Sequence, residues 1–276
     1  VIDPLHVIEG ITLSDLNETL TGGNLEEKEV KKAQEGQAQD YPDGIPECGT
    51  DAMRFALVAY TAQGRDINLD VLRVVGYRHW CNKLWNAIRF AIMNLGDGYE
   101  PPETPLTSAT PGLPPASKWA LHRLNTAVKT TVDAMEVYDF ANATTGVYAF
   151  WQYDVCDVFI ELMKPVMNGT DEVAKSATRD TLWTCLDAGL RLLHPFMPFV
   201  TEELWQRLPR RAAETAPSIM VADYPAFTDD RTDTAVEESM AVAQEIVKAT
   251  RSLRAAYNLP PKTKAELFIV TRGDAA

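Results

Sequence analysis

The sequence has few residues of the types that carry chemistry on their own. Among 276 residues there are only four cysteines and four histidines. The cysteines form no CxxC pair and the histidines show no HExxH spacing, so we predict neither a disulfide framework nor a metal site. A GxSxG string and a glycine-rich phosphate loop are absent too. We therefore assign no catalytic residue and no metal ligand to this chain.

Long hydrophobic runs are also missing. No apolar run reaches the roughly 18 residues that a membrane-spanning helix needs, so no membrane partner is expected. Residues 1–5 lack the basic start and apolar segment of a signal peptide. We expect a cytoplasmic protein. Because the chain does not begin with Met, an upstream targeting segment and an organellar form stay open.

Charge is unevenly distributed along the chain. The net charge is −13, which disfavours nonspecific binding to nucleic acid. Residues 11–43 hold eight Asp and Glu against three Lys, whereas residues 65–95 hold five Lys and Arg against two Asp. A locally basic strip on an acidic body is still compatible with specific RNA binding.

Apolar periodicity predicts a mostly α fold. We expect an antiparallel bundle of four to five long helices with appended pieces at each end. The predicted long helices cover residues 71–95, 117–138, 144–163, 171–193, 198–208 and 235–257. Pro165 should end the third of them, and Pro195 and Pro198 should make a sharp corner between the fourth and the fifth.

The two ends of the chain have weaker patterns. The acidic insertion at about 11–43 holds one plausible helix, at residues 24–37. Residues 218–221 and 265–271 have the composition of short strands, so a small α/β piece is expected at the C-terminal end.

The helix predicted over residues 71–95 carries the main functional indication. At 100° per residue, one face is apolar and should be buried, with Tyr77, Cys81, Leu84, Ile88, Ala91 and Leu95. A second face carries Arg78, Asn82, Trp85, Asn86 and Arg89. Arginine, amide and indole groups are those that stack on and hydrogen-bond to unpaired RNA bases. The same pattern would also arise if these groups bonded neighbouring helices and the Trp packed in the core.

Several strings resemble one family of enzymes. GIPECGTDAMRF at residues 44–55, QGRDINLD at 63–70, GYRHWCNKLWNA at 76–87, the HPFMPFVTEELW corner at 194–205 and RSLRAAYNL at 251–259 look like eukaryotic-type valyl-tRNA synthetases of class I. The resemblance covers nearly the whole chain. On this pattern Val1 follows directly after the KMSKS loop, so the catalytic and editing domains would lie upstream.

The resemblance implies three parts. Residues 1–70 would be a stem-contact segment, residues 71–225 the anticodon-binding helical bundle, and residues 226–276 the start of a C-terminal α/β subdomain. The bundle would grip the anticodon arm of tRNA(Val). The implied RNA contacts are Arg78, Asn82, Asn86 and Arg89, with Lys83 reaching a phosphate and Trp85 either stacking on a base or packing in the core.

The resemblance also implies partners and cofactors. The partners would be tRNA(Val) and the catalytic and editing domains of the same polypeptide. This part of the chain would need no cofactor, whereas the complete ligase would use ATP with Mg. The same region of an isoleucyl- or leucyl-tRNA synthetase, or a helical protein-interaction module without an RNA role, stays an alternative.

Overall fold

The computed structural model describes residues 3–23, 26–61, 69–260 and 262–270. The chain divides into two compact units, residues 1–232 and residues 233–276, and each is described here by itself. The described residues of both units are mainly helical, which confirms the mostly α prediction.

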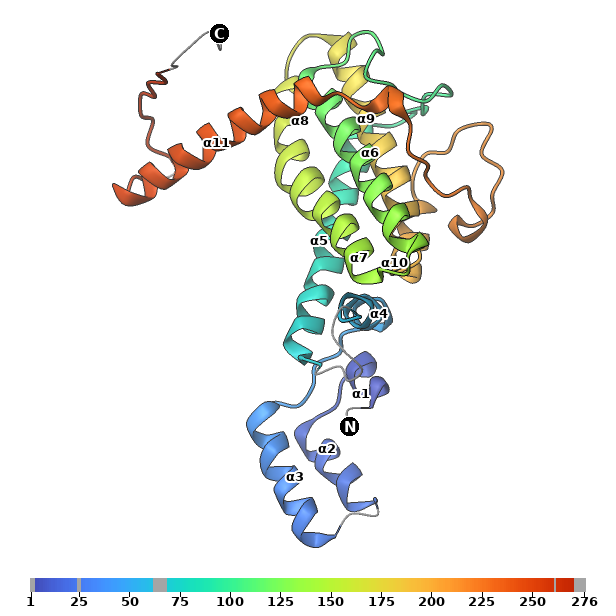
Figure 1. Ribbon diagram of the computed structural model, residues 1–276, viewed down its shortest axis with the longest axis vertical. Coiled ribbons are helices and arrows are strands. Elements are labelled where there is room, and N and C mark those ends of the chain that lie inside the picture. The colour runs from blue at the N-terminus through green and yellow to red at the C-terminus, as the bar shows by residue number, and fades with distance from the viewer. Residues whose placement is uncertain (1–2, 24–25, 62–68, 261, 271–276) are drawn as a thin grey trace. The chain divides into compact units, whose positions relative to one another are not determined.

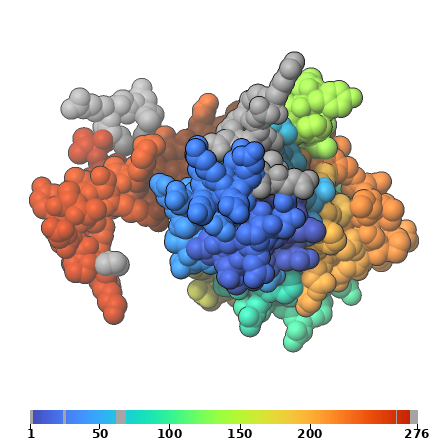
Figure 2. Space-filling model, turned by 90° about the horizontal axis from the view of Figure 1, so that it is seen from below, coloured from blue at the N-terminus to red at the C-terminus, as the bar shows by residue number. Residues whose placement is uncertain are grey.

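The first unit begins with four short helices. They are α1 (Pro4–Glu9), α2 (Leu13–Thr21), α3 (Glu27–Asp40) and α4 (Thr50–Ala59). Helices α2 and α3 pack on each other as a hairpin, which lies nearest the viewer in blue in Figure 2. Its base is closed by two backbone hydrogen bonds between Ile11 and Ile45, each 2.8 Å long.

The helix predicted at residues 24–37 is present as α3 over Glu27–Asp40, but the insertion holds a second helix that was not predicted. Helix α2 was missed, although Thr12 caps it by accepting a hydrogen bond from the Asp15 backbone N–H. Leu16 lies on its apolar side and is buried. The helix was missed because the segment is acidic overall, although its short amphipathic pattern and the cap at Thr12 are those of a helix.

The bundle follows along the chain. Its elements are α5 (Val71–Leu95), α6 (Pro115–Glu136), α7 (Phe140–Ala149), the π-helix η1 (Phe150–Phe159), α8 (Ile160–Met167), α9 (Glu172–Leu193) and α10 (Pro198–Trp205). Helices α5, α6, α7–α8 and α9 run up and down beside one another in Figure 1. This arrangement confirms the predicted antiparallel bundle, and the 71–95 helix has the predicted bounds.

Two details of the third long helix differ from the prediction. It begins at Phe140, where Asp139 caps it, and it passes through a π-helical stretch. It also continues past Pro165 to Met167. Proline removes one N–H, but the next turn still closes because the Asn168 N–H donates to the Lys164 carbonyl over 3.0 Å.

The proline corner is held by a buried polar chain. His194 Nδ1 and Thr201 Oγ1 are 2.7 Å apart, and Thr201 Oγ1 donates to the Met197 carbonyl over 2.7 Å. Thr201 is fully buried. These bonds satisfy His194 Nδ1 and Thr201 Oγ1 where α9 ends and α10 begins, whereas His194 Nε2 has no partner among the described residues.

The predicted strand at residues 218–221 was wrong, because Ile219–Val221 forms one turn of 3-10 helix. Ser218 caps that turn and its side chain donates to Glu202 over 2.7 Å. A second 3-10 turn, Asp229–Arg231, is tied to the bundle, since Arg231 Nε donates to the Leu106 carbonyl over 2.9 Å.

The second unit contains α11 (Thr234–Ala256), which Asp233 caps and which has no buried residue. Residues 265–270 of the predicted strand are exposed and form no strand, and Thr271 lies outside the described residues. A strand needs a partner for its backbone groups, and the described part of this unit offers none. The α/β character expected here was therefore wrong for residues 233–260 and 262–270.

Within the described ranges, none of the helices combines the length and apolarity that crossing a bilayer requires.

Gly189 on α9 lies at a close contact with two aromatic side chains of η1. A Cβ at this position would lie 2.8 Å from Trp151 Cζ2 and 3.0 Å from Phe150 Cε1. We expect Gly189→Ala to lower the free energy of unfolding by about 1–3 kcal/mol, because the added methyl group overpacks a rigid core. Urea unfolding measures this change.

Gly36→Ala is the matched control, since Gly36 lies inside α3 with no atom within 4 Å of the added Cβ. It should raise the stability by about 0.5–1 kcal/mol through helix propensity. Equal effects of the two substitutions would contradict the overpacking argument.

Candidate functional site

Helix α5 presents a buried face and a separate exposed face, as its sequence predicts. Asp70 caps it by accepting a hydrogen bond from the Leu72 N–H over 2.9 Å. On the predicted inner face the structure buries Cys81, Leu84, Ile88, Ala91 and Leu95, whereas Tyr77 is partly exposed. The outer face is exposed, and we name it the α5 stripe: Arg78, Asn82, Trp85, Asn86 and Arg89. All five side chains are within reach of a solution partner.

The two arginines of the α5 stripe are unengaged. Within the described part of the chain, the structure gives neither Arg78 nor Arg89 a hydrogen bond or an ion pair, and the Asn82 amide likewise has no partner. Asn86 Nδ2 donates to the Asn82 carbonyl over 2.9 Å, so its amide oxygen stays available. A polar helix face that served only to bond other helices would have partners here, so this arrangement favours a role toward a ligand.

Lys83 differs from the α5 stripe in being paired. Its Nζ lies 2.7 Å from a carboxylate oxygen of Asp157 on η1, and both side chains are partly exposed. An exposed ion pair of this kind contributes little to stability. A phosphate can therefore replace the carboxylate at small cost.

Trp85 is neither buried nor free. It is 37% exposed, and the Arg207 guanidinium lies 5.2 Å from its ring centroid. Arg207 in turn is paired with Glu203 on α10. One part of the indole is thus held by a cation–π contact, while the exposed part can accept a stacked ring.

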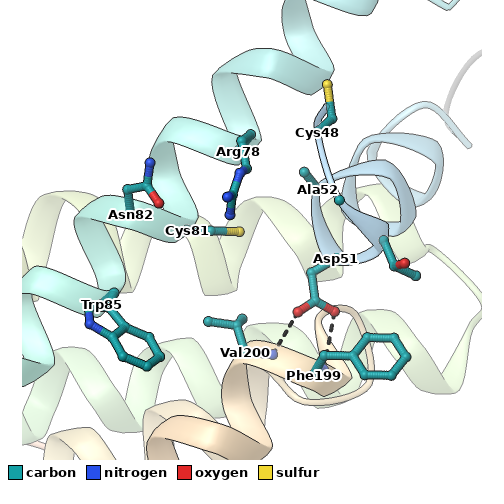
Figure 3. A pocket seen from close by; sticks show the side chains of 11 residues that line it. Cys48, Asp51, Ala52, Arg78, Cys81, Asn82, Trp85, Phe199 and Val200 are labelled. Atoms are coloured by element: carbon teal, nitrogen blue, oxygen red, sulfur yellow. Dashed lines mark hydrogen bonds between the residues drawn. The ribbon is translucent and has the colours of Figure 1, made fainter. Parts of the chain in front are cut away.

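A pocket of about 270 Å³ opens beside the α5 stripe, between α5 and the first turns of α4 and α10. Figure 3 shows Arg78, Asn82 and Trp85 reaching it from α5. Its opposite wall is formed by Cys48, Asp51 and Ala52. Its floor is formed by Val200 and Phe199, and the Phe199 ring points away from α5 in Figure 3. A second depression of about 430 Å³ continues along α5 past Arg89 and Met93. Trp85 lines both.

Asp51 fixes the geometry of this pocket. Its carboxylate accepts hydrogen bonds from the backbone N–H groups of Phe199 (3.2 Å) and Val200 (2.7 Å) at the start of α10. Burial raises the pKa of Asp51, although the two backbone hydrogen bonds oppose this rise. Arg54, one turn along α4, donates to the Pro195 carbonyl over 3.1 Å. A side chain of α4 therefore caps a helix of the bundle.

The two cysteines that line the pocket are poor nucleophiles. Burial raises the pKa of the Cys81 thiol to about 11 and also raises the pKa of the Cys48 thiol. Neither forms a useful amount of thiolate near neutral pH. Among residues 3–23, 26–61, 69–260 and 262–270, no three His, Cys, Asp or Glu side chains lie close enough to hold a metal ion. What this surface offers is stacking, hydrogen bonding and positive charge.

Sequence reasoning missed two side chains of this surface, Phe199 and Arg207. Phe199 is 65% exposed at the pocket floor, and the predicted corner at Pro195 and Pro198 did not single it out. Its exposure agrees with helix geometry, since Thr201 is buried and a residue two positions earlier points about 200° away. Arg207 could not be placed over Trp85 from the sequence, because the contact joins residues 122 positions apart.

Comparison with known proteins gives a consistent picture. Residues 117–269 match the family described as "Anticodon-binding domain of tRNA ligase". Over all of its 276 residues the chain is 51% identical to the valine--tRNA ligase of Rattus norvegicus and 53% identical to that of Homo sapiens, covering 22% of each. It is 54% identical to the "Valine--tRNA ligase, mitochondrial 1" of Arabidopsis thaliana, over 92% of this chain and 23% of that one. The chain thus spans less than a quarter of the length of these relatives.

We expect Asp51→Ala to lower the free energy of unfolding by about 1–3 kcal/mol, since two backbone N–H groups at the start of α10 lose their acceptor. Asp51→Asn keeps one oxygen and should be milder. Urea unfolding at about pH 7 compares the three proteins, and an Ala variant as stable as the wild type would contradict the capping role.

The same carboxylate has a pH signature. Because the pKa of Asp51 is raised in the folded protein, its titration removes stability as pH rises from the ordinary value of 3.8 through the raised pKa. Asp51→Asn does not titrate. The stability of the wild type relative to this variant should therefore decrease with rising pH across that window, and a constant difference would refute the assignment.

Proposed function

The chain belongs to the family of anticodon-binding domains of tRNA ligases, and we propose that it binds the anticodon arm of tRNA(Val) as part of a valine--tRNA ligase, through the α5 stripe that precedes the matched residues 117–269. The observation that carries the proposal is the exposure of all five stripe side chains beside a pocket, with Arg78 and Arg89 unengaged. The valine specificity of the relatives favours tRNA(Val) over the isoleucine and leucine tRNAs.

Each stripe residue has a role in this proposal. Arg78 and Asn82 present donors and an acceptor at the pocket, where an unstacked base can enter. Trp85 and Phe199 offer exposed ring area for stacking. Arg89 and Asn86 extend the contact along α5, and Lys83 takes a phosphate in exchange for Asp157.

The remaining parts follow the same scheme. We assign residues 1–70 to the stem-contact segment, residues 71–225 to the anticodon-binding bundle and residues 226–276 to the start of a C-terminal subdomain. The complete polypeptide would contain catalytic and editing domains and attach valine to tRNA(Val) with ATP and Mg. Relatives named as mitochondrial in Arabidopsis thaliana and Saccharomyces cerevisiae keep both the cytoplasm and an organelle open.

A titration with labelled tRNA tests the proposal. The chain should bind tRNA(Val) more tightly than the same tRNA with a swapped anticodon. Arg78→Ala and Arg89→Ala should each weaken binding by about 1–3 kcal/mol where the guanidinium reads a base edge, a magnitude carried over from DNA readout. Where it contacts a phosphate, the loss should be smaller and should come with a reduced salt dependence.

Arg73→Ala is the matched control. It removes the same charge from the first turn of α5, where Arg73 lies 4.4 Å from the Tyr60 ring centroid and outside the α5 stripe. Unchanged binding in both stripe variants would make the stripe a structural feature. Failure of the wild-type chain to bind tRNA at any salt concentration would instead favour a protein-interaction module.

A further inference from the structure

A second basic region lies in the second unit, far along the chain from the α5 stripe. Residues 246–264 carry five Lys and Arg and no Asp or Glu, in a chain whose net charge is −13. The five are Lys248, Arg251, Arg254, Lys262 and Lys264. We call this stretch the α11 basic segment.

Three of these cations are free in the structure. Arg251, Lys262 and Lys264 are exposed and have no hydrogen bond or ion pair to any described residue. Lys248 has a long contact of 3.5 Å with Glu245, and both of these side chains are highly exposed. Three of the five cations are therefore available to an outside partner, and Lys248 is held only by this long contact.

A defined turn at the end of α11 holds the segment together. Asn258 has a φ of 51°, the Leu259 N–H donates to the Arg254 carbonyl over 2.9 Å, and the Asn258 N–H donates to the Ala255 carbonyl over 3.0 Å. This pair of bonds is a Schellman motif. Arg254 Nη2 also donates to the Pro260 carbonyl over 2.7 Å. The chain is thereby fixed where it leaves the helix, just before Lys262.

The helix dipole explains only part of this charge. It favours cations in the last turn of a helix, which accounts for Arg254. The effect falls off within one turn, so it does not account for Lys248 earlier in α11 or for Lys262 and Lys264 beyond its end. The helix dipole alone therefore does not explain why the positive charges of this acidic chain are grouped here.

We propose that the α11 basic segment binds phosphates of the same tRNA, as a second contact that carries no base specificity. This proposal presumes the RNA partner of the proposed function and adds a binding region to it. Lysine and arginine heads on a helix end and the following turn fit a phosphate backbone, which fixes position without reading sequence. The acidic remainder of the chain repels RNA that is not held at such points.

The test compares two triple variants with equal loss of charge. Arg251→Ala, Lys262→Ala and Lys264→Ala together remove the three free cations. Lys28→Ala, Lys31→Ala and Lys32→Ala remove three exposed lysines of α3 and form the control. All six side chains are exposed, so both variants should fold, and circular dichroism melting verifies this.

Affinity for tRNA(Val) is then measured as a function of salt concentration. For the first variant we expect the slope of log K against log salt to decrease in magnitude by about two, and the affinity at about 0.1 M salt to fall roughly tenfold or more. The preference for tRNA(Val) over the anticodon-swapped tRNA should stay unchanged. The control variant should show an unaltered slope.

Three results would overturn the proposal. The first variant could keep the wild-type slope, or both variants could lose the same slope, which would indicate only net charge. Polyglutamate at equal charge could compete as well as tRNA for the wild-type chain but not for the first variant, which would make the segment a site for acidic polypeptides. The two proposals can be tested separately. Variants of the α5 stripe should lose the preference for the tRNA(Val) anticodon, whereas the triple variant of the α11 basic segment should change only the slope of log K against log salt.

Discussion

The pocket beside the α5 stripe depends on one buried carboxylate, that of Asp51. Asp51 on α4 accepts the two backbone N–H groups that open α10, across 148 and 149 residues of sequence. Those groups have no partner within their own helix, and a negative charge suits the positive end of the helix dipole. Arg54 holds the preceding turn through Pro195. The position of Phe199 on α10 relative to α5 is therefore fixed by a third helix, α4.

An aromatic cluster strengthens the same junction. The Phe55 ring, fully buried on α4, lies 4.8 Å from Tyr77 and 5.2 Å from Trp80 of α5, measured between ring centroids. It also contacts Phe196 of the proline corner at 6.3 Å. Apolar burial and directed hydrogen bonds thus act on the same short helix. Because both kinds of contact converge on α4, the N-terminal segment and the bundle are one compact unit and not two loosely joined pieces.

The features that could be predicted from the sequence are those that depend on residues close together along the chain. The bounds of α5 and its two faces follow from local rules, a cap at Asp70 and a period of 3.6 residues. The strand predicted at residues 265–271 is not formed over residues 265–270, because a strand needs a partner and the described part of the second unit offers none. The role of Asp51 was also inaccessible, since a carboxylate next to a helix start predicts a cap for its own helix and not for another.

The ion pair between Lys83 and Asp157 has a consequence for how RNA would settle on α5. In the proposed complex, a phosphate that approaches Lys83 would also meet the negative charge of Asp157, which offsets part of the attraction of the ammonium group. Lys83 then adds little to attraction over long distances. Its role in the proposed complex would be to fix the position of one phosphate at short range, once Asp157 has released the ammonium group.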